Sequence, residues 1–211
     1  MSILDGPRVA PASGGPARSM VILVHGYGSN GEDLIGLVPH WRAALPDTVF
    51  ISPNAPQPCR DAPGGFQWWP VWGGDRLAGV RGAAPVLDGF IDAELAAHGL
   101  TEDRLALVGF SQGTMMSLHV APRRKRQLAG VVGYSGMLID AEPDEIRTRP
   151  PVLLVHGSVD PMVPVAAFYR AEAALKDLGF EVASHVSPGL GHSIDLPGLK
   201  LGGAFLSRVL A

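Results

Sequence analysis

Short apolar runs alternate along the chain with longer segments of mixed polarity. Runs rich in Val, Ile and Leu predict buried strands at residues 20–24, 48–51, 104–108, 128–134 and 151–155. Residues 180–187 alternate between apolar and polar side chains, which predicts a further strand that is half-buried. Helices are predicted at residues 83–97, 114–120, 165–178 and 199–210, and another helix begins after Asn30. This alternation predicts an α/β fold with a mostly parallel, doubly wound sheet flanked by helices.

Two segments lack this periodicity. Residues 1–17 are rich in Gly, Pro, Ala and Ser, and are predicted to form short edge strands or a loose arm. Residues 52–75 are dense in Pro, Gly and Trp, and are predicted to be irregular. The 211 residues contain no internal repeat or linker, so we expect a single domain over residues 1–211.

Composition narrows the classes of function. Apolar residues make up 46% of the chain and charged residues 18%, so a sizeable core can form. The net charge of −3 gives no broad attraction to nucleic acid, and no nucleic-acid partner is predicted. The basic run at residues 123–126 is the exception, and we interpret it as a solvated helix end rather than an anion-binding patch.

The cysteine content and the apolar runs bear on the cellular location of the protein. Cys59 is the one cysteine, so no intrachain disulfide can form, which is compatible with a reducing compartment. The first residues lack the basic start and apolar core of a signal peptide, and no apolar run approaches the roughly 20 residues that span a bilayer. We therefore expect a cytoplasmic protein with no stable membrane insertion; a homodimer is left open. No paired His or Cys spacing indicates a metal site.

The segment Gly109–Gly113 carries the pattern Gly-x-Ser-x-Gly between a predicted strand and a predicted helix. This is the nucleophile-elbow pattern, in which a strained turn holds a serine hydroxyl above the end of a sheet. A Cβ at either glycine would crowd the strand and the helix, and the helix N-terminus favours negative charge that develops beside the serine. We predict Ser111 as a catalytic nucleophile; the alternative is a tight turn with an inert serine.

A serine hydroxyl needs a histidine that accepts its proton. In proteins with this elbow, an acid and then the histidine follow the serine along the chain. His192, in a loop after the last predicted strand, is the predicted base, and His185 within that strand is its competitor. His119 lies two turns into the elbow helix and is predicted to point away. His156 ends a strand and is predicted to hold the turn that carries the acid.

Asp160 is the predicted orienting acid. It lies in a loop just beyond the strand at residues 151–155, where a carboxylate can reach the histidine at the sheet edge. The competing carboxylates lie mostly on helix faces or in polar loops; they are Asp140, Glu142, Asp144, Glu145, Glu172, Asp177, Glu181 and Asp195.

An oxyanion hole needs two backbone N–H donors. The residue after the nucleophile, here Gln112, supplies one, and the loop after an early strand supplies the other. The segment His25–Gly28 follows the first strong strand, and its glycines allow close approach to a substrate. We predict the backbone N–H groups of Tyr27 and Gln112 as the donors; the alternative for the segment is an ordinary glycine-rich turn.

Together these motifs carry a family resemblance. The chain resembles the carboxylesterase/phospholipase branch of the α/β-hydrolases, which includes the acyl-protein thioesterases. The matching segments follow the family's order over nearly the whole chain: 24–28, 52–56, 109–113, 156–164 and 191–192. The resemblance implies Ser111, Asp160 and His192 as the triad, Tyr27 and Gln112 as the oxyanion donors, and no cofactor. It also implies activity on carboxylic esters, with thioesters as an extension.

Several apolar residues are candidates for substrate binding. Trp68, Trp69 and Trp72 lie in the irregular stretch, and each either packs onto the sheet or walls an acyl pocket. Met162 and Val163 follow the predicted acid and add apolar surface, as do Met137 and Leu138. Residues 135–150 leave room for little or no lid, which favours small-molecule esters of short to medium acyl chains.

Three other functions compete with a carboxylesterase. One is a lysophospholipase or acyl-protein thioesterase on the same fold. Another is a non-catalytic binding protein that retains the fold, which the intact Ser, Asp, His order disfavours. The last is a nucleotide-binding protein, suggested by Gly26, Gly28 and Gly31, but no acidic residue ends the next strand at a suitable distance.

Overall fold

A seven-stranded sheet forms the centre of the molecule. The computed structural model describes residues 4–71, 74–139 and 142–211. The strand order is β1-β3-β2-β6-β7-β8-β9. The strands are β1 (Arg8–Val9), β2 (Ser19–Val24), β3 (Thr48–Ile51), β6 (Leu105–Phe110), β7 (Gly130–Tyr134), β8 (Val152–Gly157) and β9 (Val182–Ser187). β1 pairs antiparallel with β3 and every other pairing is parallel, so the predicted mostly parallel sheet is confirmed.

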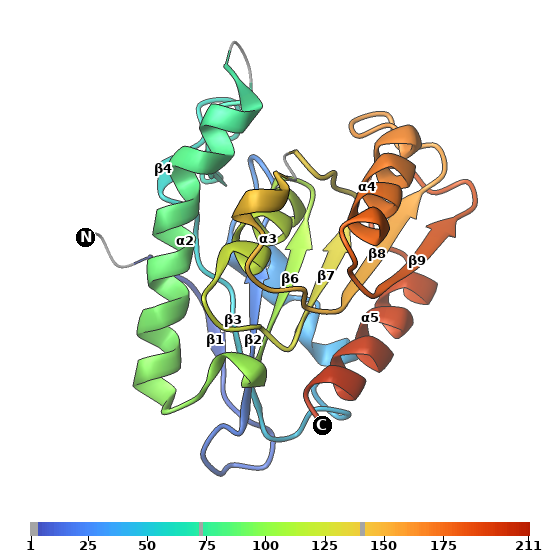
Figure 1. Cartoon of the computed structure of the whole chain (residues 1–211). Helices are drawn as coiled ribbons and strands as arrows, with labels where there is room; N and C mark the ends of the chain where they lie inside the picture. Colours follow the sequence, from blue (N-terminus) through green and yellow to red (C-terminus); the bar gives the residue numbers. More distant parts are fainter. Residues whose placement is uncertain (1–3, 72–73, 140–141) are drawn as a thin grey trace.

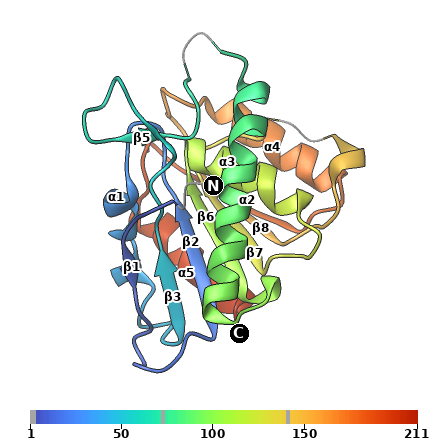
Figure 2. The same cartoon turned by 90° about the vertical axis from the view of Figure 1, so that its left-hand side faces the viewer.

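Helices cover both faces of this sheet (Figures 1 and 2). On one face lie α2 (Arg76–His98), α3 (Gln112–Arg123) and α4 (Val165–Asp177), and on the other lie α1 (Gly31–Ile35), η1 (Val38–His40) and α5 (Leu196–Val209). Short 3₁₀ turns, η2 (Glu102–Arg104) and η3 (Pro143–Glu145), precede β6 and follow β7. A separate apolar cluster is buried on each face. Each helix therefore buries one apolar side against strands that are apolar on both faces.

The carboxyl ends of the parallel strands meet at one edge of the sheet, at the top of Figure 1. β6 lies in the middle of the sheet, with β2 on one side and β7 on the other. The loops that follow β2, β6, β7, β8 and β9 therefore converge at this edge, which is where ligands bind in open α/β sheets. In the described residues, no helix is long and apolar enough to cross a membrane.

The stretch predicted to be irregular contains a small hairpin, and α2 begins earlier than predicted. β4 (Gln57–Pro58) and β5 (Phe66–Gln67) form a two-stranded antiparallel sheet. α2 begins at Arg76 rather than residue 83, and the carboxylate of Asp75 caps it by accepting from the Leu77 N–H at 2.8 Å. Gly79 resembles a helix breaker in the sequence, but a Cβ there would lie 2.4 Å from the Trp69 ring. The glycine therefore allows the first turns of α2 to pack on that indole.

The basic run at residues 123–126 is less solvated than predicted. The side chain of Arg124 is buried, with 7% of the residue exposed, whereas Lys125 and Arg126 are exposed. Its guanidinium forms ion pairs with Asp88 and Asp92 of α2 and lies 3.8 Å from a carboxylate oxygen of Glu102. The interpretation of a wholly solvated helix end was wrong, because Arg124 ties the end of α3 to α2 and η2.

Candidate active site

Ser111 stands at the turn between β6 and α3 in a strained backbone conformation. Its φ of 52° and ψ of −113° lie outside the regions that L-residues ordinarily occupy. Its N–H donates to the carbonyl oxygen of Tyr134 in β7 at 2.9 Å, which fixes the turn to the neighbouring strand. The strain holds Ser111 at the carboxyl edge, where it is partly exposed, with the N-terminus of α3 directly behind it. This is the geometry of a nucleophile elbow.

The glycines on either side of Ser111 have no room for a side chain. A Cβ on Gly109 would lie 2.5 Å from the backbone carbonyl atoms of Gly113, where α3 begins. A Cβ on Gly113 would lie 1.7 Å from the carbonyl oxygen of Val24 in β2. The close approach of β6, α3 and β2 therefore depends on glycine at both positions.

Alanine at Gly113 is expected to lower the free energy of unfolding by about 3 kcal/mol or more, because Val24 or the first turn of α3 must move. Gly82→Ala is the matched control: a Cβ there meets nothing within 4 Å, and the residue lies inside α2. It should raise the free energy of unfolding by roughly 0.5–1 kcal/mol. Denaturant unfolding of both variants measures the two effects. Equal effects would show that the elbow tolerates a Cβ.

His192 and Asp160 form a hydrogen-bonded pair beside the elbow. The Nδ1 atom of His192 lies 2.7 Å from Oδ2 of Asp160. The imidazole also packs on Phe110, the residue before Ser111, with 4.9 Å between the ring centroids. An imidazole whose Nδ1–H donates to a carboxylate keeps Nε2 as its proton acceptor. The pair therefore has the form of a general base held beside the elbow.

Contacts between the loop after β8, which carries Asp160, and the loop after β9, which carries His192, hold this pair in position. Gly157, at the end of β8, abuts the carbonyl oxygens of Leu190 and Gly191, since a Cβ there would lie 2.3 Å from each. The N–H of Val159 donates to the Leu190 carbonyl oxygen at 3.0 Å. His156, buried at the end of β8, contacts the Val163 carbonyl oxygen through Nε2 at 2.8 Å. His156 thus holds the turn that carries Asp160, as predicted.

The environment of Asp160 favours its ionised form. Burial alone raises the pKa of this carboxyl, but the hydrogen bonds from His192 and from the backbone N–H groups of Val163 and Met162 outweigh burial and lower the pKa below its usual value. Oδ1 accepts from the Met162 and Val163 N–H groups at 2.8 and 2.9 Å, and Oδ2 faces the imidazole. The carboxylate therefore stays charged near neutral pH and can stabilise an imidazolium beside it.

The loop after β2 lies against the elbow. A Cβ on Gly26 would be 3.3 Å from the Cβ of Ser111, so this backbone runs past the nucleophile. His25 is buried, and burial lowers its pKa. Its Nδ1 contacts the Gly26 carbonyl oxygen at 2.8 Å, while Nε2 accepts from the Ala55 N–H at 2.9 Å, an arrangement that suits the neutral ring. His25 therefore has a structural role beneath the predicted donor Tyr27.

The comparisons with known proteins agree with this geometry. The model of the phospholipase/carboxylesterase family matches residues 5–210. The chain belongs to that family. An acyl-protein thioesterase 1 from Gibberella zeae is 31% identical, over 97% of this chain and 95% of the relative. Esterase YpfH of Escherichia coli is 30% identical, over 85% of this chain and 78% of that protein.

A solved structure shows the same fold at higher identity. The crystal structure of esterase PE8 has a TM-score of 0.93 and 43% sequence identity, and the match covers 99% of this chain and 100% of that one. The predicted family and the α/β-hydrolase fold are therefore confirmed, and the protein is a hydrolase of the carboxylesterase type.

In this family member, the Gln112 side chain links the elbow to the segment after β5. Gln112 is buried; its Oε1 accepts from the Trp68 N–H at 2.9 Å and its Nε2 donates to the Trp69 carbonyl oxygen at 2.8 Å. The Trp68 indole N–H in turn donates to the carbonyl oxygen of His25 at 3.1 Å. These bonds connect the two backbone segments predicted to supply oxyanion donors. The sequence pattern predicts Gln112 only as a backbone N–H donor, and no spacing in the sequence signals the role of its side chain.

Leucine at Gln112 is expected to lower the free energy of unfolding by about 2–4 kcal/mol, because the Trp68 N–H and Trp69 carbonyl would be buried without partners. The backbone N–H of residue 112 remains, so ester hydrolysis should weaken, by about tenfold in kcat, without being abolished. Thermal unfolding and initial rates measure the two effects. Unchanged stability would contradict the linking role.

The tryptophans and apolar residues proposed to bind substrate differ in exposure. Trp68 and Trp69 are only 1% and 4% exposed and belong to the hydrophobic core. Of the two predicted alternatives, they therefore pack onto the sheet and do not line an open acyl pocket. Trp72 lies outside the described residues. Val163 is also buried, whereas Met162 is 66% exposed next to Asp160. Of Trp68, Trp69, Val163 and Met162, Met162 is therefore the side chain that is open to a ligand.

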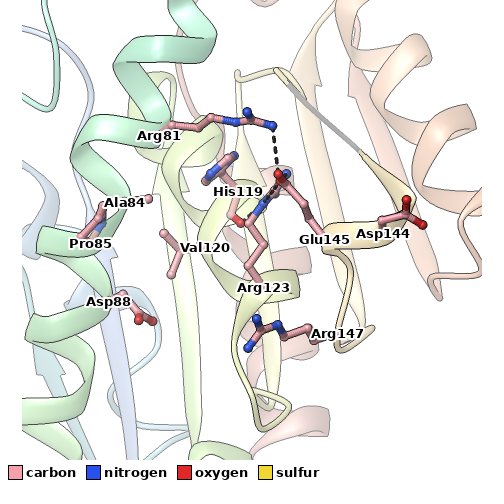
Figure 3. Close-up of a pocket in the computed structure, with 10 residues that line it drawn as sticks. All are labelled: Arg81, Ala84, Pro85, Asp88, His119, Val120, Arg123, Asp144, Glu145 and Arg147. Atoms are coloured by element: carbon pink, nitrogen blue, oxygen red, sulfur yellow. Dashed lines mark hydrogen bonds and ion pairs between the residues drawn. The ribbon is translucent and has the colours of Figure 1, made fainter.

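The competing histidines His185 and His119 lie within a strand and a helix rather than in the loops that carry Asp160 and His192. His185 pairs with Val155 within β9, two residues before that strand ends. His119 lies along α3 and lines a cavity of about 530 Å³ between α2, α3 and the segment 144–147 (Figure 3). Arg81 and Arg123 point toward Glu145 in this cavity, and both pair with its carboxylate. None of the residues that line this cavity belongs to the candidate site.

Several competing carboxylates have structural partners. Asp195 caps α5 by accepting from the Gly198 N–H at 2.8 Å. Glu172 accepts from Lys176, and Glu181 pairs with Arg208. Asp140 lies outside the described residues. Within the described part of the chain, no group of three or more His, Cys, Asp or Glu side chains could hold a metal ion.

Proposed function

We propose that the protein is a serine carboxylesterase in which Ser111, Asp160 and His192 form the catalytic triad. The observation that carries the proposal is the 2.7 Å contact between His192 Nδ1 and Asp160 Oδ2, on an imidazole packed beside the elbow. The strained backbone of Ser111 supports the role of nucleophile. Each step is assigned to groups of the chain itself, and the proposal calls for no cofactor or metal.

The first half-reaction forms an acyl-enzyme. Ser111 Oγ bonds to the ester carbonyl carbon as His192 Nε2 takes the hydroxyl proton, and the carbonyl π electrons move onto the oxygen. The backbone N–H groups of Tyr27 and Gln112 donate to this oxyanion. When the tetrahedral species collapses, the bond to the alcohol oxygen breaks, and that oxygen leaves with the proton from His192. Asp160 stabilises the imidazolium throughout.

The second half-reaction repeats these roles with water. His192 takes a proton from a water molecule as its oxygen attacks the acyl carbon, and the bond to Ser111 Oγ then breaks. The serine recovers its proton from His192, and the carboxylic acid leaves. The same sequence cleaves thioesters, and the likeness to an acyl-protein thioesterase 1 favours this second candidate activity.

An apolar groove supports short to medium acyl chains. A Cβ on Gly136 would lie 2.9 Å from the Ser111 carbonyl oxygen, so the chain after β7 starts beside the nucleophile. The groove lies between the residues that follow and α4, and its volume is about 250 Å³. It is lined by Met137, Leu138, Ile139, Ala167, Arg170, Ala171 and Ala174. An apolar groove of this size suits a chain of limited length.

A panel of p-nitrophenyl esters from acetyl to palmitoyl tests this function. The protein should hydrolyse short and medium chains, with kcat/KM falling for long ones, and Ser111→Ala should be inert on all of them. An optimum at palmitoyl would overturn the assigned chain length. Inertness of the wild-type protein on every ester, thioesters included, would overturn the catalytic function and favour a binding protein.

The proposal also covers the domain organisation, the cellular compartment and the partners of the protein. We propose that residues 1–211 act as one domain in the cytoplasm, on small-molecule esters. The two apolar clusters on opposite faces of one sheet support the single domain, and the lone cysteine, Cys59, is compatible with the compartment. A homodimer and the lack of a nucleic-acid partner stay predictions, which light scattering and a binding assay with duplex DNA test.

A further inference from the structure

A cavity lined mostly by polar residues, the polar cavity, lies directly beside the loop predicted to hold the oxyanion. Its volume is about 600 Å³, within the range of small-molecule sites. It is lined by Tyr27, Gln57, Pro58, Arg60, Asp61, Gln67 and Pro70. Tyr27 follows Gly26, where an added Cβ would lie 3.3 Å from the Cβ of Ser111, so the cavity begins one residue away from the backbone that passes the nucleophile.

The walls of this cavity are fixed to the oxyanion loop. The N–H of Gly28 donates to the Phe66 carbonyl oxygen at 2.9 Å, and the Phe66 N–H donates to the Ser29 carbonyl oxygen at 2.7 Å. The Tyr27 hydroxyl donates to the Asp61 carboxylate at 2.6 Å. A ligand in the cavity would therefore be held at a set position relative to the reacting carbonyl.

The lining suits a neutral ligand with many hydroxyl groups. Gln67 donates to the Oε1 of Gln57 at 3.2 Å, which leaves the NH₂ group of Gln57 and the Oε1 of Gln67 for a ligand. Arg60 adds N–H donors and Asp61 adds acceptor capacity. Each hydroxyl group both donates and accepts, so donors beside acceptors match it. The lining carries one positive and one negative side chain, so it favours no net charge on the ligand.

The strand order separates this cavity from the apolar groove. β2 and β7 flank β6 on opposite sides, and Ser111 follows β6. The polar cavity is built around the loop after β2, and the apolar groove around the segment after β7. An ester extends in two directions from its carbonyl carbon. One direction then meets apolar side chains, which suit an acyl chain, and the other meets polar ones.

We propose that the polar cavity binds the alcohol moiety of the ester, and that the preferred alcohols are neutral polyols or sugars. This inference rests on the proposed carboxylesterase function and names its substrate class. Gln57 and Arg60 are the residues that would select the alcohol, because both are exposed in the cavity and neither holds the oxyanion loop in place.

Butyrate esters that differ only in the alcohol test the proposal. The measured quantity is the ratio of kcat/KM for 6-O-butyryl glucose, and for glycerol monobutyrate, to kcat/KM for hexyl butyrate. In the wild-type protein this ratio should be at least about 10 for one of the two polar esters. Arg60→Ala and Gln57→Leu should each lower it by about fivefold or more. Arg18→Ala, an exposed arginine before the opposite end of β2, is the matched control and should leave it unchanged.

The outcomes separate this inference from the function on which it rests. A wild-type ratio near 1, or a ratio that Arg60→Ala and Gln57→Leu leave unaltered, overturns the alcohol site while the esterase stands. An equal fall in Arg18→Ala overturns it as well, because the effect would not belong to the cavity. If the wild-type protein cleaves no ester at all, the proposed function fails and the alcohol site fails with it.

Discussion

Replacing Ser111 by alanine is expected to lower kcat for p-nitrophenyl butyrate by about 10⁴- to 10⁶-fold. The hydroxyl is the only group of the proposed mechanism that bonds to the substrate, so its loss removes the acyl-enzyme pathway altogether. Activity that remains would come from water attacking a carbonyl still polarised by the two backbone N–H groups. Initial rates at saturating substrate measure the effect, at protein concentrations high enough to detect this residual activity.

The fold of the Ser111→Ala variant provides the control. Its melting temperature should be close to that of the wild-type protein, because alanine keeps the Cβ of serine and therefore the same backbone strain at φ 52°. A large loss of activity with unchanged melting then belongs to chemistry rather than to unfolding. A variant that keeps more than a tenth of wild-type kcat would exclude Ser111 as the nucleophile.

Replacing His192 by alanine is expected to lower kcat by about 10⁴- to 10⁶-fold as well, because no other imidazole of the described site hydrogen-bonds to Asp160 from beside the elbow. His156 also lies near Asp160, 3.4 Å from its Oδ2, but it is buried and is engaged by the Val163 carbonyl oxygen. The general base therefore cannot be replaced from within the loop. Initial rates on p-nitrophenyl butyrate measure the loss.

His185→Ala is the matched control for this prediction. His185 lies within β9 opposite Val155, and its loss should change kcat by less than about twofold, as is usual for a substitution away from the reacting groups. The reverse pattern, in which His185→Ala abolishes turnover and His192→Ala spares it, would assign the base to β9. It would also leave the contact between His192 and Asp160 without a catalytic purpose.

The features that could be predicted from the sequence are those set by local rules. β2, β6 and β8 are short apolar runs, and each lies within a residue or two of its predicted range. The elbow was recognisable because its steric demands fall on five consecutive residues. The pairing of Asp160 with His192 followed from chain order and from the rule that parallel strands end at one edge.

The features that could not be predicted depend on contacts between distant segments. The early start of α2 depends on Gly79, where a Cβ would lie 2.4 Å from the ring of Trp69, a residue of the preceding loop. Arg124 resembled its solvated neighbours, and only the fold brings Asp88 and Asp92 to it. The role of the Gln112 side chain depends on a segment more than 40 residues earlier in the chain. No local periodicity contains such information.

Labelling with a fluorophosphonate, followed by mass spectrometry of the intact protein and of its tryptic peptides, tests the central claim most directly. We predict one adduct per chain, on the peptide of residues 105–123, with the added mass on Ser111. The Ser111→Ala variant should remain unlabelled, and His192→Ala should label far more slowly. An adduct on another residue, or a wild-type protein that folds but takes up no label, would contradict the assignment of Ser111 as an activated nucleophile.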